Sequence, residues 1–136
     1  MSLLDRLRRR RSPAPVVLDP DDPSLVVLVE AFEAARADSA VLADAAGRGV
    51  NLDQPLLMRH HLVGLTGASI VERAAELLGQ DGYTLHDLGG GAVLATRTQR
   101  LTALSASQER SRMAGLAQRL GGDVVGWDAL GPDAPA

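Results

Sequence analysis

Two adjacent histidines, His60 and His61, are the side chains of this sequence best suited to metal binding or proton transfer. They lie in residues 56–63, a short run between a proline and a glycine, which predicts a β-strand. Successive side chains of a strand point to opposite faces, so a regular strand cannot direct both imidazoles at one metal ion. We therefore expect no metal site, and we interpret His60 as a hydrogen-bonded histidine of the core.

An arginine-containing surface is expected on the opposite face of this strand. If His60 faces the core, Arg59 and His61 face the open side of the sheet, and Arg97 on the neighbouring strand is expected to join them. Guanidinium groups are planar, charged and bidentate, so such a cluster could hold a carboxylate or a phosphate. Trp127, the only tryptophan, would lie at the edge of the same surface. These four residues are the predicted partner-binding residues; the alternatives are an ion-paired or solvated face for the arginines and a place in the core for Trp127.

Residue patterns typical of catalysis are absent from the sequence. The chain has no cysteine, hence no thiolate nucleophile, and no serine in a G-x-S-x-G arrangement. The glycine run 89–91 is not followed by the Lys-Ser/Thr of a P-loop. None of the three aromatic residues lies on a central strand, where stacking of RNA bases would need them. We predict a protein that is not an enzyme and that binds no cofactor.

Length and composition indicate one soluble domain. A chain of 136 residues can bury a single core, and its apolar runs, such as Leu25 to Val29, are far shorter than the roughly 18 residues of a membrane-spanning helix. The lack of cysteine fits a reducing compartment, and no apolar stretch of a secretory signal follows the basic start. We expect a cytoplasmic protein.

Basic residues are concentrated at the N-terminus. Residues 1–12 carry five arginines and one aspartate, or +4, so the net charge of −3 leaves −7 for residues 13–136. The arginines are Arg6, Arg8, Arg9, Arg10 and Arg11. We expect residues 1–18 to be a flexible basic tail that could make a weak contact with RNA, an anionic membrane or an acidic protein.

Residues 19–50 are predicted to form a helical segment. Asp22 and Pro23 are typical of an N-cap and a first helical position. The apolar residues that follow have the spacing of a buried helical stripe: Leu25, Leu28, Phe32 and Ala35. A second helix is expected from Ser39 to Ala46.

Residues 51–130 give the order strand, helix, strand, strand, helix, strand. The strands are predicted near 56–63, 83–88, 92–99 and 123–128, with a glycine hairpin at 89–91. Capping boxes are expected at the starts of the helices, Ser69 with Glu72 and Ser105 with Gln108. Two split βαβ units make a ferredoxin-like α+β sandwich, with an antiparallel sheet of order 4-1-3-2 and both helices on one face. The other face must be polar or be covered by the N-terminal helices, a ligand or a second subunit; residues 131–136 are expected to be a flexible tail.

Three short motifs resemble the RraB family, the B-type regulators of ribonuclease E activity. They are Arg59-His60-His61-Leu62, Gly82-Tyr83-Thr84-Leu85 and Gly126-Trp127, and the likeness spans roughly residues 40–130. Family members have Tyr-Asp before the last Gly-Trp, where this chain has Val124 and Val125, and many carry acidic tails that it lacks. The resemblance implies a ferredoxin-like sandwich and a noncatalytic protein that binds ribonuclease E and modulates RNA decay.

Two other functions remain open from the sequence. A ligand-sensing domain of ACT type has the same βαββαβ order and binds small molecules where subunits meet, so a homo-oligomer is among the possible assemblies. The second is a contact with RNA or an anionic membrane made by the arginine-rich tail alone.

Overall fold

A computed structural model of the chain describes residues 16–133. The five arginines of the predicted basic tail lie outside the described residues, as do residues 134–136 of the predicted C-terminal tail. The start of that predicted tail, residues 131 and 132, belongs instead to the last strand. No helix among the described residues is long and apolar enough to span a membrane.

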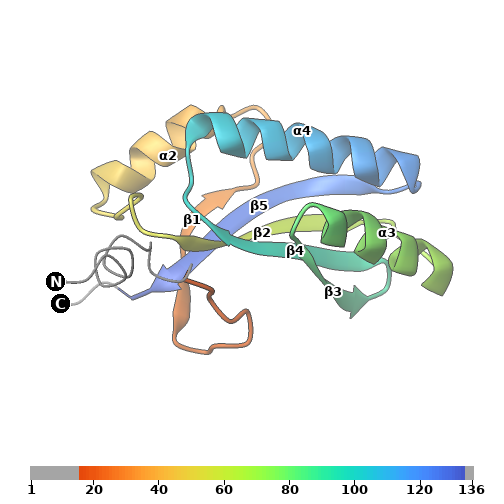
Figure 1. Cartoon of the computed structure of the whole chain (residues 1–136). Coiled ribbons are helices and arrows are strands. Elements are labelled where there is room, and N and C mark those ends of the chain that lie inside the picture. The colour runs from red at the N-terminus through yellow and green to blue at the C-terminus, as the bar shows by residue number, and fades with distance from the viewer. Residues whose placement is uncertain (1–15, 134–136) are drawn as a thin grey trace, which may run out of the picture.

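The fold is an α+β sandwich of five strands and three helices (Figure 1). The strands are β1 (Leu25–Ala31), β2 (Leu56–Val63), β3 (Thr84–Gly89), β4 (Ala92–Gln99) and β5 (Asp123–Pro132). The helices are α2 (Asp38–Gly47), α3 (Ala68–Gln80) and α4 (Ala103–Arg119). The predicted helix from Ser39 to Ala46 is confirmed as α2, and the predicted glycine hairpin joins β3 to β4.

All strands pair antiparallel in the order β1-β5-β2-β4-β3. The four predicted strands follow one another in the predicted order 4-1-3-2, which is β5-β2-β4-β3 in these labels, but the predicted four-stranded sheet is wrong, because a fifth strand, β1, lies at the edge beside β5. Strand β2 pairs with β5 on one side and with β4 on the other, and β3 pairs only with β4. The sheet is therefore wider than a four-stranded ferredoxin-like sheet, and β2 lies at its centre.

The predicted first helix is wrong, because its residues form β1. Asp22 accepts a hydrogen bond from the amide of Ser24 at 2.9 Å, so it makes a turn and does not cap a helix. The following run is rich in valine, which favours a strand. Val29 and Ala31 are buried and Glu30 between them is exposed, which is the two-residue period of a strand at the sheet edge.

Both predicted capping boxes are also wrong. Helix α3 begins after Gly67, which has no side chain to accept a hydrogen bond from the first turn. Helix α4 does begin at a capping box, but Thr102 is the N-cap, and its hydroxyl accepts from the amide of Ser105 at 3.0 Å while Ser105 returns the bond. Ser105 is thus the third helical residue and not the N-cap, and α4 begins three residues earlier than the sequence pattern indicated.

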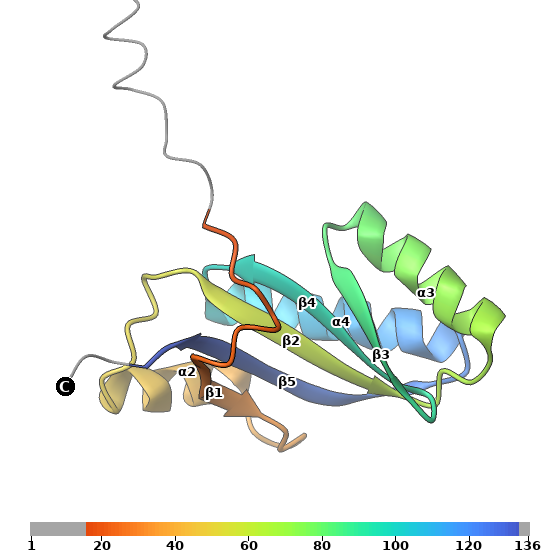
Figure 2. The same cartoon turned by 90° about the horizontal axis from the view of Figure 1, so that it is seen from below.

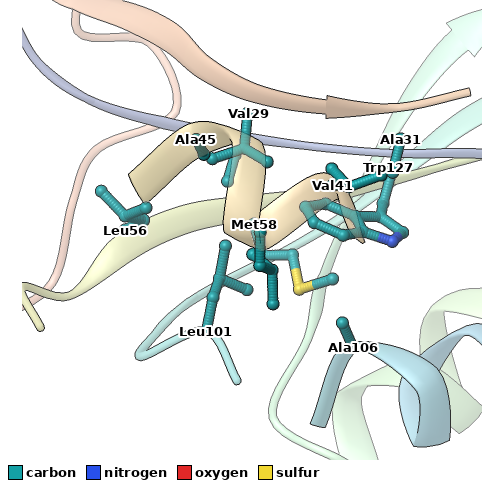
Figure 3. Close-up of a cluster of buried hydrophobic side chains, with 11 residues drawn as sticks. Val29, Ala31, Val41, Ala45, Leu56, Met58, Leu101, Ala106 and Trp127 are labelled. Carbon is teal, nitrogen blue, oxygen red and sulfur yellow. The ribbon is translucent and has the colours of Figure 1, made fainter. Parts of the chain in front are cut away.

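The three helices cover one face of the sheet, and two clusters of buried side chains fill the space between them (Figure 1). The first cluster contains Trp127, with Val41 of α2 and Ala31 of β1 near its indole ring (Figure 3). Its other members are Val29, Leu42, Ala45, Leu56, Met58, Leu101, Ala106 and Ala129. The second cluster packs α3 and α4 on the other end of the sheet: Leu62, Leu65, Ala74, Leu78, Tyr83, Val93, Ala95, Met113, Leu116 and Ala117.

The opposite face of the sheet carries no helix among the described residues, and residues 16–24 cross part of it (Figure 2). The amide of Leu18 donates to Thr98 Oγ1 on β4 at 2.8 Å. Leu57, which pairs with Thr98 and shares its face, is only 1% exposed. An extended segment, residues 16–24, therefore covers part of this face. The N-terminal helices expected to cover it do not, because residues 25–31 form β1 and α2 packs on the other face.

Candidate interaction surface

The centre of the open face is a cluster of three polar side chains. Arg59 on β2 lies directly opposite Asp128 on β5, and residues opposite each other in an antiparallel pair share a face. Arg59 donates from Nε to Oδ1 at 2.8 Å and from Nη2 to Oδ2 at 2.5 Å. His61, two residues along β2, has its Nε2 3.0 Å from the same Oδ1. The Asp128 carboxylate thus joins the arginine and the histidine that the sequence placed on this face.

Hydrogen bonding keeps the Asp128 carboxylate ionised although it is buried. Burial alone would raise the pKa of Asp128, but the hydrogen bonds from Arg59 and His61 outweigh it and hold that pKa below its usual value of 3.8. The same bond to Asp128 raises the pKa of Arg59. Because two of its three guanidinium nitrogens already donate to a carboxylate of its own chain, the charge of Arg59 is paired within the fold and attracts a partner's anion less strongly.

Exposed apolar side chains surround this polar centre. The Phe32 ring, just after β1, meets the His61 ring edge-on with centroids 5.0 Å apart, and Phe32 is 40% exposed. Val63, two residues after His61 on β2, is 41% exposed. On the far edge strand β3, His86 pairs with Leu94, which lies opposite His61. Leu88, two residues after His86, is 61% exposed. The open face therefore combines a polar centre, satisfied within the fold, with an apolar rim.

Arg97 does not join this surface, which corrects the prediction. In the β2–β4 pair Arg97 lies opposite Met58, a core residue, so its side chain is on the helix-covered face. There its guanidinium carbon lies 4.2 Å from the centre of the Tyr83 ring, and Nη2 donates to the buried Glu109 of α4. The sequence predicted that β4 lies beside β2 but not the register of this pair, and a shift of one residue in register moves a side chain to the other face of the sheet.

Trp127 is not at the edge of the open face either. It is fully buried in the first core cluster (Figure 3). It lies opposite His60 and donates from Nε1 to Asp38 Oδ1 at 3.2 Å. Arg110 of α4 donates to the same oxygen of Asp38 at 2.5 Å. The alternative interpretation, a tryptophan of the core, therefore describes its position.

His60 is buried as expected, but without the expected hydrogen bonds. It is 0% exposed, its ring meets the Tyr83 ring edge-on at 5.8 Å, and neither ring nitrogen has a partner among the described residues. Burial lowers the pKa of His60 from 6.5 to about 4, so the ring is neutral near pH 7.

Two carboxylates that organise these clusters, Asp128 and Glu109, were not singled out from the sequence. Glu109 is 5% exposed and accepts hydrogen bonds from Tyr83, Arg97 and Gln99. The sequence does contain a signal for Glu109, because this residue lies within the buried stripe of α4, where a charged side chain needs a partner. Asp128 gave no comparable signal, because its pairing with Arg59 depends on the register of two strands 69 residues apart in sequence. No group of three metal-binding side chains occurs in residues 16–133.

Comparison with known proteins gives one finding. A family model described as "RraB: Regulator of ribonuclease activity B" matches residues 35–129, which is more than half of the chain. The matched range includes Arg59, His61 and Asp128, but it begins after β1 and Phe32. Neither the search of curated proteins nor that of solved structures gave a significant match.

Proposed function

This chain belongs to the RraB family of regulators of ribonuclease activity, and we propose that it acts without catalysis by binding a ribonuclease of the ribonuclease E type and modulating RNA decay. The observation that carries the proposal is the family match over residues 35–129. The hydrogen bonding of the buried polar side chains agrees with a noncatalytic role. The buried carboxylates Asp128 and Glu109 are both engaged with basic or hydroxyl groups of the same chain, so neither is free to act as an acid or a base.

The open face supports a protein partner better than an anionic ligand. Its arginine is neutralised by Asp128, whereas Phe32, Val63 and Leu88 expose apolar surface around the polar centre. Several exposed apolar side chains on one face are typical of a surface that another protein covers. We therefore place the partner site on this face, with His61 and the apolar rim as its contacts and with Arg59 as the residue that holds Asp128 in place.

The regulatory function is tested by an RNA cleavage assay. A ribonuclease E-type enzyme from the same organism should cleave a standard RNA at a rate that changes as this protein is added, and the change should saturate with the fraction of enzyme bound. The protein alone should leave the RNA intact. An unchanged cleavage rate at tens of micromolar protein would contradict the proposed function, and cleavage by the protein alone would contradict its noncatalytic part.

A further inference from the structure

Two hollows lined by described residues lie along β1, the edge strand of the sheet. The first, of about 540 Å³, lies between β1 and α2, and the second, of about 510 Å³, continues it toward the end of β5. Val27 and Leu28 line both hollows. Together they form one groove, which we call the β1–α2 groove, beside the unpaired side of β1.

The exposed strand edge favours an extended occupant. β1 contains no proline and no arginine, and Val27 in its middle is 42% exposed, so little prevents another chain segment from pairing with it. Arg48, at the end of α2, donates from Nη2 to the carbonyl of Leu28 at 3.3 Å. An arginine of this chain therefore already uses a β1 carbonyl as an acceptor.

The charges of the groove favour a basic occupant. Its lining includes four carboxylates, Glu30, Glu33, Asp44 and Asp133, against two guanidinium groups. Of these carboxylates only Asp44 forms an ion pair among the described residues, with Arg36. Glu30 and Glu33 are thus exposed acids without an ionic partner in residues 16–133, next to apolar Val27 and Leu28.

One segment of the same chain has the matching composition and can reach the groove. Residues 3–11 contain three leucines and five arginines. Leu18 is fixed at Thr98, and the row Thr98–Leu57–Leu130–Val27 crosses three strand-to-strand spacings, roughly 14 Å, to the groove. A stretch of six residues, the number from 12 to 17, can reach at most roughly 20 Å, so the chain is long enough to bridge this distance.

We propose that residues 3–11 bind in the β1–α2 groove of their own chain, with arginines on Glu30 and Glu33 and leucines against Val27 and Leu28. This contact covers the exposed edge strand and keeps other extended segments away from it. It does not depend on the proposed function.

A spin label tests this placement in the full chain. Because the protein has no cysteine, Ser2→Cys gives a single site for a nitroxide. The label should cause loss of the amide NMR signals of Val27, Leu28 and Val41, while the signals of α3 remain. The double variant Glu30→Gln with Glu33→Gln should restore the lost signals, whereas Glu72→Gln with Glu76→Gln, two exposed acids on α3, should not.

Other occupants give different results in the same experiment. Uniform signal loss, or none at β1 and α2, would overturn the proposal. Signal loss that appears when the nitroxide-labelled protein is mixed with a separate isotope-labelled, cysteine-free protein would assign the groove to a second copy and would also overturn it. A correct fold in each variant is checked by the unchanged amide spectrum of α3 and α4.

Discussion

Arg59 and Asp128 lie opposite each other on β2 and β5, and the guanidinium of Arg59 holds the buried carboxylate of Asp128 by two hydrogen bonds. Residues that look like a basic binding patch in the sequence are thus part of an internal ion pair. Asp128 is 3% exposed, so the pair links the two central strands at a place that solvent barely reaches. The consequence is that Arg59 contributes to stability and positions Asp128, and the neighbouring exposed side chains are left to make contacts.

Replacing Arg59 should destabilise the protein. Arg59→Leu leaves a buried carboxylate without its main partner, and we expect a loss of about 3 kcal/mol in the free energy of unfolding, measured with urea. The double variant Arg59→Leu with Asp128→Leu should recover most of this loss, because it removes both charges. A loss below about 0.5 kcal/mol for Arg59→Leu would show that the pair does not stabilise the fold.

The buried His60 should make the protein less stable in mild acid. Its pKa is lowered to about 4 in the folded state against 6.5 when unfolded, so the unfolded state binds the proton first as the pH falls. The stability it contributes is fully present above pH 6.5 and decreases toward pH 4, by about 3 kcal/mol in total.

The variant His60→Leu isolates this contribution, because it fills the same buried position without a titrating group. The difference in unfolding free energy between the two proteins should change by about 3 kcal/mol between pH 7 and pH 4. Asp128, whose pKa is lowered, contributes stability that is lost at still lower pH, and it is present in both proteins. A constant difference across this range would contradict the assignment to His60.

Tyr83, the single tyrosine, should resist ionisation while the protein is folded. Burial, and then its hydrogen bond to Glu109, raises the pKa of Tyr83 above its usual value of 10. As the pH is raised, the absorbance of the phenolate should therefore appear only together with the loss of helical circular dichroism. In Glu109→Gln the phenolate should appear at a lower pH than in the unmodified protein. Ionisation at about pH 10 with an intact fold would show that the phenol is more accessible than the structure indicates.

Gly126 should be required for the junction between β5 and β1. A Cβ built at this position would lie 2.4 Å from the carbonyl oxygen of Ala31 and 2.8 Å from the ring of Phe32. Gly126→Ala should cost about 2 kcal/mol and increase amide exchange in β1 more than in β4. Gly79→Ala, inside α3 at a position with nothing within 4 Å, is the control and should not lower stability, because alanine favours a helix more than glycine does. Equal unfolding free energies for Gly126→Ala and Gly79→Ala would contradict the close contact at Gly126.

The sequence predicted those elements whose signals are local. Strands β2 to β5 and helix α2 have clear boundaries in glycines, prolines and apolar spacing, and they were found close to their predicted ranges. β1 was missed because Leu25, Leu28 and Phe32 happen to have helical spacing, although the valines between them favour a strand. Its pairing with β5, more than 90 residues later, leaves no local signal.

The residues of the candidate site were likewise predicted correctly where the signal lies within one strand, and wrongly where it depends on the pairing of two strands. The alternation along β2 correctly separated His60 from Arg59 and His61, because that period is a property of one strand. Arg97 and Trp127 were placed on the wrong face because their orientation depends on register with β2, which the sequence does not encode locally.

The central claim, that a ribonuclease partner binds the open sheet face, is tested most directly by titrating a ribonuclease E-type enzyme with two matched variants in a calorimeter. Leu88→Glu changes the apolar rim of the open face, and Leu104→Glu changes a leucine of similar exposure, 68%, at the start of α4 on the helix side. Both should keep the melting temperature of the unmodified protein, because both side chains are exposed. We predict at least about tenfold weaker binding for Leu88→Glu and unchanged binding for Leu104→Glu. Unchanged binding for Leu88→Glu with weakened binding for Leu104→Glu would move the partner site to the helices and contradict the account.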